Sequence, residues 1–202
     1  MKIVKTSLLP FALTALLFAC GNVGNKGQEA HNHHPDAEHV HNDAESQTTK
    51  KKSLSPRTAA MAMIGSNHVH IDYGSPSKRG RMIFGGLVGY GTVWATGAHK
   101  ATTIRFDENG AINGENIPAG KYGLFTIPGE SSWTIIISKD WDMHLADDYN
   151  EANDLVRVTS PVNKLDEVVE SLTFEVQQME NNKGKIIIKW DQTSVSFDLE
   201  NK

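Results

Sequence analysis

The stretch that decides the fold runs from Gly110 to Trp133 and reads Gly-Ala-Ile-Asn-Gly-Glu-Asn-Ile-Pro-Ala-Gly-Lys-Tyr-Gly-Leu-Phe-Thr-Ile-Pro-Gly-Glu-Ser-Ser-Trp. Asn113-Gly114 predicts a tight turn, because both residues tolerate positive φ. Between Lys121 and Ile127 apolar and polar residues roughly alternate, which is typical of a strand. Pro128-Gly129 then turns the chain, and Trp133 begins a second apolar run. The stretch therefore predicts the central hairpin of a β-sheet.

Further runs typical of short strands occur on both sides of this hairpin. They cover 67–73, 102–106, 155–159, 171–177, 185–190 and 194–199, and the last two are expected to form a final hairpin. Asp107-Glu108-Asn109-Gly110 predicts another hairpin turn. The acidic segment 139–154 is expected to be a surface loop with one short helical turn. We therefore expect an all-β fold, a single antiparallel β-sandwich or flattened barrel of about eight or nine strands over residues 53–202.

Composition excludes some partners. Apolar residues make up 39% of the chain and charged residues 22%, which suits a globular domain with its own core. The formal net charge of -4 favours neither nucleic acid nor an anionic membrane surface as a partner. Cys20 is the only cysteine, so an internal disulfide is excluded.

Residues 1–19 are interpreted as a lipoprotein signal peptide. Lys2 and Lys5 give a positive start, and 8–18 is an apolar run too short to span a bilayer comfortably. Cys20 follows a small residue and precedes a glycine, which resembles a bacterial lipobox. A short transmembrane anchor is the alternative. Under the lipobox interpretation acyl chains on Cys20 hold the protein on a membrane. No Asp follows Cys20, which favours the outer membrane of the cell envelope, without deciding between its periplasmic and surface leaflets.

Residues 20–52 are expected to be an unfolded tether, because they contain too few apolar residues to build a core. Five of the nine histidines lie here within eleven residues: His31, His33, His34, His39 and His41. Imidazoles at this density suit Zn²⁺, Ni²⁺ or Cu²⁺. The tether is therefore a candidate metal-binding segment, although a solvated polar linker explains the same composition.

A second candidate metal site lies in the strand expected at 67–73. His68, His70 and Asp72 point to one face, because side chains at i and i+2 project together. An ordinary half-buried strand with a polar outer face gives the same pattern. Two or three ligands on one strand also need partners from elsewhere before they hold a metal.

Three motifs resemble one known family. Residues 73–85 are similar to its YSRPSxKGRxIFG signature, 90–102 to YGxVWRTGANEAT, and 118–128 to PAGKYxLFTIP. The chain thus resembles the secreted bacterial domain-of-unknown-function family two-nine-one-one over about residues 53–200. The resemblance implies an exported β-rich domain and no established activity. The positions that depart from the signatures include Ser75, Ala95, His99 and Lys100; a ligand site built on the family's residues there is lost or changed in this chain.

Three functions remain open. The favoured one is a non-enzymatic domain that binds an unknown ligand or envelope protein. Its surface would gather five polar and aromatic residues: Arg81, Tyr90, Trp94, His99 and Trp141. The alternative is transition-metal handling through the tether, with His68, His70 and Asp72 as a second site. A hydrolase is less favoured, because the chain lacks the Gly-x-Ser-x-Gly and His-Glu-x-x-His patterns and has no cysteine to spare as a nucleophile.

Overall fold

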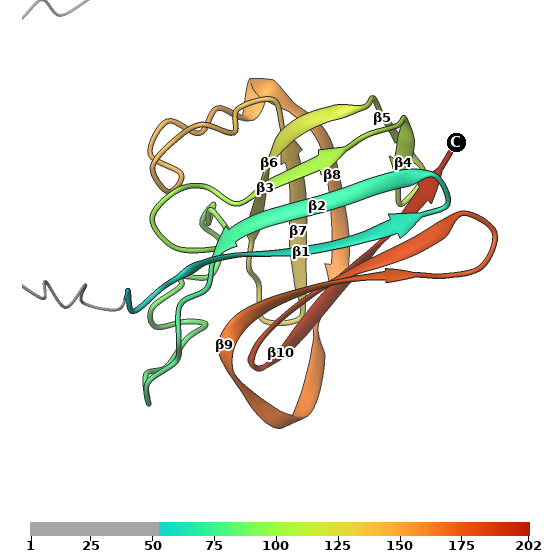
Figure 1. The fold of residues 1–202 in the computed structure, drawn as a ribbon. Helices are drawn as coiled ribbons and strands as arrows, with labels where there is room; N and C mark the ends of the chain where they lie inside the picture. Colours follow the sequence, from blue (N-terminus) through green and yellow to red (C-terminus); the bar gives the residue numbers. More distant parts are fainter. Residues whose placement is uncertain (1–52) are drawn as a thin grey trace, which may run out of the picture. The chain divides into compact units, whose positions relative to one another are not determined.

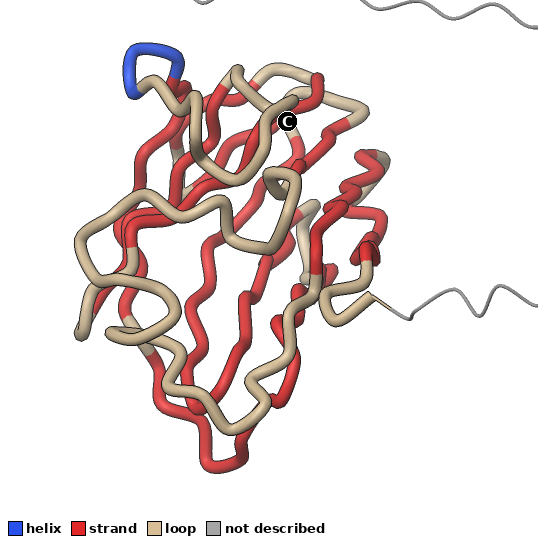
Figure 2. The backbone as a smooth tube through the Cα atoms, turned by 90° about the vertical axis from the view of Figure 1, so that its left-hand side faces the viewer, coloured by secondary structure: helices blue, strands red, loops and turns tan. Residues whose placement is uncertain are grey.

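The computed structural model describes residues 53–202. They form ten β-strands in two antiparallel sheets, as expected for a sandwich (Figure 1). The helical segment drawn in Figure 2 is the single turn η1 (Glu151–Asn153), capped by the side chain of Asn150. Within 53–202, no helix is long and apolar enough to cross a membrane. The expected all-β class and the short helical turn in the acidic loop are confirmed.

The first sheet contains the predicted central hairpin. Its six strands follow the order β1 (Arg57–Ile64), β2 (Asn67–Gly74), β3 (Thr103–Phe106), β6 (Gly120–Ile127), β7 (Ser132–Ser138) and β8 (Asp154–Pro161). In the β6–β7 hairpin Leu124 lies opposite Ile137 and Phe125 opposite Ile136. The alternation along β6 therefore sends Leu124 and Phe125 to opposite faces of the sheet, as the sequence predicted.

The second sheet is built around a strand that doubles back on itself. Its order is β5 (Glu115–Ile117), β4 (Gly110–Ile112), β10 (Lys183–Asn201) and β9 (Asn163–Gln178). Asn201 N donates to Asn182 O at 2.9 Å, a contact that a straight strand of this length, about 60 Å, does not allow. Figure 1 shows the two legs of β10, and Asp191, with φ 55°, lies between residues 184–189, which pair with β9, and residues 199–201, which pair with β4. The predicted final hairpin is thus confirmed within β10.

One expected connection was wrong, and the strands are slightly more numerous than the expected eight or nine. The segment 107–109 is not a hairpin turn, because it carries the chain from β3 in the first sheet to β4 in the second. The buried side-chain oxygen of Asn67 accepts hydrogen bonds from Asp107 N (2.9 Å) and Glu108 N (3.1 Å), which hold this crossing against β2. The strands number ten rather than eight or nine, since β1 and the short β4 and β5 were not recognised.

The main core lies between the two sheets. It includes the fully buried Trp133 and Trp190, with Phe84 and Trp94 packed against them. The rings of Trp94 and Trp190 are stacked with centroids 6.0 Å apart, while Phe84 meets Trp133 edge-on at 4.8 Å. Aromatic rings bury large apolar areas, so this cluster is a major source of sandwich stability.

Candidate functional site

Loops cover one half of the outer face of the first sheet. Phe125 and Ile136 form a second buried cluster with Ala95, Ala101 and Met143. The loops 75–102 and 139–153 meet above this half, where Ala101 N donates to Met143 O at 3.0 Å and Leu145 N donates to His99 O at 2.7 Å. The outer face over β6 and β7 is therefore closed.

The other half, over β1 to β3, carries the histidines predicted on one face. His68, His70 and Asp72 alternate with the buried Val69 and Ile71, which confirms the expected facing. They line a shallow hollow of about 260 Å³ together with Thr103, Arg105 and Lys121. The two imidazole rings are tilted by 59°, with centroids 6.0 Å apart.

Most charged groups around the two rings are already paired. Arg57 binds the carboxylate of Asp72, and Arg105 binds Asp107 through Nε at 2.9 Å and Nη2 at 2.7 Å. The ammonium of Lys121 lies 3.9 Å from the ring centroid of Trp141, in a cation–π contact. Asp72 is therefore engaged by an arginine, whereas among residues 53–202 the His70 ring has no hydrogen bond or ion pair and His68 has only the distant Asp107, at 3.8 Å.

The register of β1 adds two residues that the sequence analysis missed. Met61 lies directly opposite His70, and Met63 lies opposite His68. Their exposed fractions are 53% and 45%. The available signal was the Met-x-Met spacing, which matches the His-x-His spacing of β2, but it has meaning only once β1 is known to be a strand paired in this register.

Two of the five residues predicted to bind a ligand have structural partners. The guanidinium of Arg81 donates to the carbonyl oxygens of Ser77 (2.7 Å) and Lys78 (3.1 Å), and these bonds hold the turn 77–81 together. Trp94 is half-buried in the aromatic core, and its indole N–H donates to Gly97 O at 3.1 Å. Both residues therefore help to hold the fold.

The other three lie on the surface. Tyr90 and Trp141 are 42% and 38% exposed, and His99 is exposed with a φ of 67°. Lys100 is also exposed, whereas Ser75 and Ala95 are buried, so the positions that depart from the signatures do not share one environment. Cys20 and the tether histidines His31, His33, His34, His39 and His41 lie outside the described residues.

The acidic loop contains a tightly bound carboxylate. Asp154, whose side chain is 4% exposed, accepts hydrogen bonds from Tyr149 (2.5 Å) and from Arg157 (2.7 Å). Burial raises the pKa of Tyr149 strongly, and the hydrogen bond to Asp154 raises it further. This triad fastens the loop to β8.

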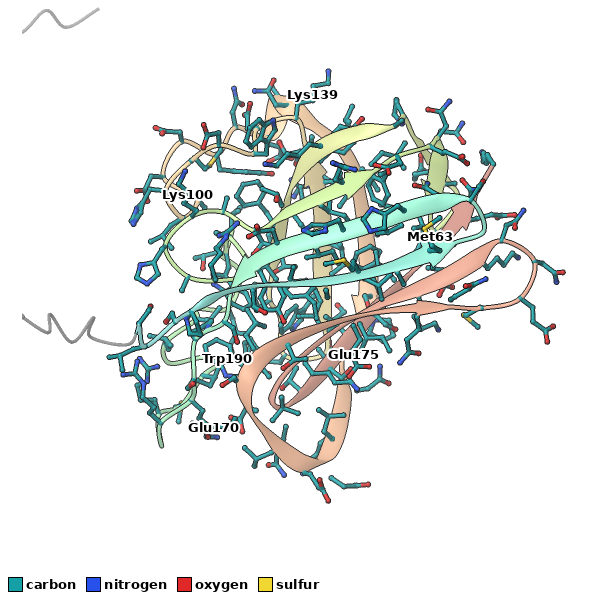
Figure 3. The ribbon with its side chains drawn as sticks, in the orientation of Figure 1. Met63, Lys100, Lys139, Glu170, Glu175 and Trp190 are labelled. Carbon is teal, nitrogen blue, oxygen red and sulfur yellow. The ribbon has the colours of Figure 1, made fainter. Side chains whose placement is uncertain are left out.

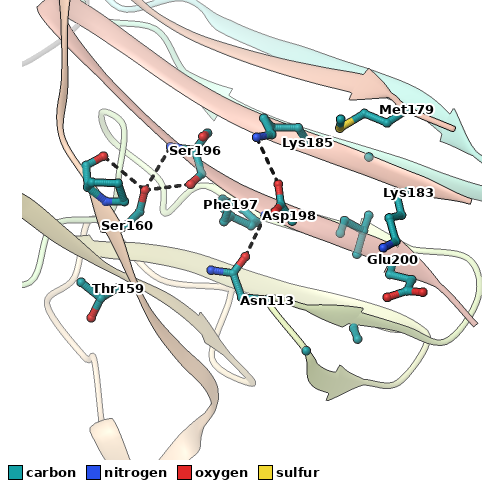
Figure 4. A pocket seen from close by; sticks show the side chains of 15 residues that line it. Asn113, Thr159, Ser160, Met179, Lys183, Lys185, Ser196, Phe197, Asp198 and Glu200 are labelled. Carbon is teal, nitrogen blue, oxygen red and sulfur yellow. Dashed lines mark hydrogen bonds and ion pairs between the residues drawn. The ribbon is translucent and has the colours of Figure 1, made fainter. Parts of the chain in front are cut away.

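A hollow of about 630 Å³ lies between β8, β4 and β10 (Figure 4). The polar groups that line it mostly bind one another. Lys185 Nζ lies 3.3 Å from Asp198 Oδ1, and Ser160 Oγ donates to Ser196 O at 2.7 Å. Asp198 N donates to Asn113 Oδ1 at 2.8 Å. The hollow offers charged and hydroxyl groups to a polar ligand, but Lys185, Asp198 and Ser160 must first exchange an existing partner.

Comparison with known proteins gives a family and no activity. A sequence model described as "Protein of unknown function (DUF2911)" matches residues 55–199. No curated protein and no solved structure matches the chain. The matched region contains all three signature motifs and almost every described residue. The resemblance inferred from those motifs is confirmed, and the chain belongs to the DUF2911 family.

Proposed function

We propose that this chain is a lipid-anchored protein of the bacterial cell envelope that binds transition-metal ions without catalysing a reaction. The observation that carries the proposal is the pair His68 and His70 on the half of the outer sheet face that the described loops leave open. Within residues 53–202, no hydrogen bond or ion pair engages the His70 ring, and His68 has only Asp107, at 3.8 Å. Neutral imidazoles are the commonest metal ligands in proteins.

The sheet and the tether would bind metal with different strengths. Strand β2 already fixes the backbones of His68 and His70, so binding there orders only side chains. We expect the tether histidines (31–41) to pay a larger entropic cost, because an unfolded segment must be ordered around the ion. The sheet would then hold an ion more tightly, while the tether adds weaker sites for Zn²⁺, Ni²⁺ or Cu²⁺.

Calorimetric titration of the full chain with Ni²⁺ and Zn²⁺ tests this function. Replacing His68 and His70 with alanine should remove the tighter class of sites and leave the weaker class. Replacing the five tether histidines should do the reverse. His144→Ala is the matched control, because this exposed histidine is paired with Asp147 at 2.9 Å, away from the candidate face. A parent chain that binds neither ion, and no copper ion either, would exclude the proposal.

A second candidate function is the binding of a polar organic ligand in the hollow between β8, β4 and β10. Its size and its mixture of lysine, carboxylate and hydroxyl groups favour a hydroxylated molecule. Titration with neutral oligosaccharides, followed by the backbone amide signals of Lys185 and Asp198 in NMR spectra, would reveal such binding. Unchanged signals would leave metal binding as the proposed function.

A further inference from the structure

We propose that Met61, Met63, His68 and His70 together form a site for a soft monovalent metal ion, with Cu⁺ as the natural occupant. The inference rests on the proposed function and names its ion. β1 and β2 are antiparallel, and the four residues form two directly opposed pairs, Met61 with His70 and Met63 with His68. Opposed residues project to the same face with Cβ atoms about 4.5–5.5 Å apart. The second strand thus supplies the partner ligands that one strand alone lacks.

The separation of the two rings fits a shared ion. A metal–nitrogen bond of about 2.0 Å, added to the distance from a ring nitrogen to its centroid, puts each centroid about 3.2 Å from the ion. Two rings on opposite sides of one ion would thus be at most about 6.4 Å apart. The His68 and His70 centroids are 6.0 Å apart, which is inside that limit. The separation of the two rings is therefore compatible with both of them binding one ion after rotation about the side-chain bonds.

Within residues 53–202, packing does not explain the exposure of Met61 and Met63. Ala60 and Ile64 of β1 turn toward the core, so Met61 and Met63 face outward, and neither belongs to a buried cluster. Met63 is labelled in Figure 3 near the end of β1 that turns into β2. Outward positions of a half-exposed sheet usually carry polar side chains. Two flexible thioethers directly opposite two imidazoles form instead a patch of metal-binding donors.

The chemistry of the four donors selects the ion. Thioether sulfur is a soft ligand that favours Cu⁺, whereas imidazole accepts many transition metals. All four donors are neutral, so they bring no negative charge to offset a divalent ion. The carboxylates of Asp72 and Asp107 are bound by Arg57 and Arg105, and Asp107 also lies 3.8 Å from His68 Nδ1. The patch should therefore bind a monovalent ion more favourably than a divalent one.

The test uses the full chain with alanine at the five tether histidines, so that only the domain binds metal. Cu⁺ is supplied without oxygen in the presence of a reductant, and its affinity is measured by competition with a coloured Cu⁺ chelator. We expect one tightly held ion per chain. Met61→Leu with Met63→Leu should weaken Cu⁺ binding by at least about 100-fold, because even outer-shell partners of a metal contribute 10–100-fold. Binding of Zn²⁺ should change little, since zinc prefers the imidazoles.

Met82→Leu with Met179→Leu is the matched control. These methionines are also exposed, at 71% and 49%, and lie outside the patch, so Cu⁺ affinity should stay at the parent value. Leucine conserves side-chain volume at all four positions, and unchanged melting temperatures would show that the variants fold. If the Met61 and Met63 variant binds Cu⁺ as tightly as the parent, the assignment is wrong, and the exposed methionines are better explained as a protein-docking surface.

A second measurement separates this inference from the broader function. In the same chain labelled at its methionine methyl groups, Ag⁺ serves as a diamagnetic probe with the ligand preference of Cu⁺. The signals of Met61 and Met63 should shift on addition of Ag⁺, and those of Met82 and Met179 should not. Unshifted methyl signals together with retained Zn²⁺ binding would overturn the thioether site alone. Loss of all metal binding in every chain would overturn the proposed function as well.

Discussion

At the scale of single residues, Tyr149 shows how burial changes the chemistry of one hydroxyl. It donates to Asp154 at 2.5 Å and accepts from Arg157 at 2.9 Å. Burial raises its pKa above the ordinary value of 10.0. The unfolded chain therefore releases this proton at a lower pH than the folded chain does. The protonated Tyr149 hydroxyl therefore stabilises the folded chain fully below about pH 10, and this contribution is lost as the pH rises beyond it.

The variant Tyr149→Phe tests whether Tyr149 causes a loss of stability above pH 10. Urea unfolding of the parent should show a free energy that falls more steeply above pH 10 than that of the variant, whose side chain has no proton to lose. The difference between the two should be constant from pH 7 to 9. Tyr90→Phe, at an exposed position, should follow the parent throughout. Parallel curves for parent and Tyr149→Phe above pH 10 would contradict the argument.

Gly74, at the end of β2, is required in this chain by close backbone approach. A Cβ at this position would overlap the carbonyl oxygen of Ala98, which belongs to the backbone and has little freedom to move. We expect Gly74→Ala to lower the free energy of unfolding by about 1–3 kcal/mol, the usual cost of overpacking. Gly89→Ala is the control, because the nearest atom to its added Cβ is the Thr92 hydroxyl oxygen at 3.3 Å. Equal stability of the two variants in denaturant titrations would disprove this explanation.

At the scale of elements, the loop that carries the first signature is fastened to the turn of β10. Lys78 Nζ lies 2.5 Å from Asp191 Oδ1, and the two side chains are only 23% and 21% exposed. Ser75 Oγ donates to Leu172 O of β9 at 2.8 Å. The loop after β2 is therefore joined to both long strands of the second sheet, which is a structural role for Ser75 and Lys78.

A double-mutant cycle on Lys78 and Asp191 measures that link. We expect a coupling free energy of about 1–2 kcal/mol, above the 0.2–1 kcal/mol of exposed pairs, because the two charges are largely shielded from water. The more exposed pair Lys185 and Asp198, at 36% and 67%, should give the lower value in the same cycle. A coupling at Lys78 and Asp191 no larger than at the exposed pair would show that the link is not energetically important.

How far the sequence predicted these elements depended on local signals. The hairpin at Pro128-Gly129 and the alternation along 67–73 were predicted correctly, because turn chemistry and period-two patterning are both local. β1 was missed because its Ala-Ala-Met-Ala-Met run lacks the β-branched and aromatic residues that mark strands. For the same reason, the sequence predicted only the histidine half of the candidate site. His68 and His70 share a strand, whereas their pairing with methionines depends on a register between strands.

At the scale of the whole molecule, the proposed anchor sets where the domain acts. Cys20→Ser removes the thiol that would carry acyl chains, so the variant should move from the membrane fraction to the soluble fraction. Cell fractionation and immunoblotting of parent and variant make the comparison. A Ser→Ala change at Ser7, before the proposed lipobox, is the matched control and should remain with membranes. A Cys20→Ser protein that still sediments with membranes would rule out lipidation as the anchor.

The doubled strand β10 has a consequence for how the chain reaches its folded state. Its second leg lies between the first leg and β4, so residues 194–201 form an inner strand of the second sheet although they come last among the described elements. While a ribosome is still making those residues, the earlier strands lack a central neighbour, and the inner face around Trp190 stays uncovered. A chain that we propose to be exported therefore remains open during synthesis, and it closes its sandwich only after residue 201 has been delivered.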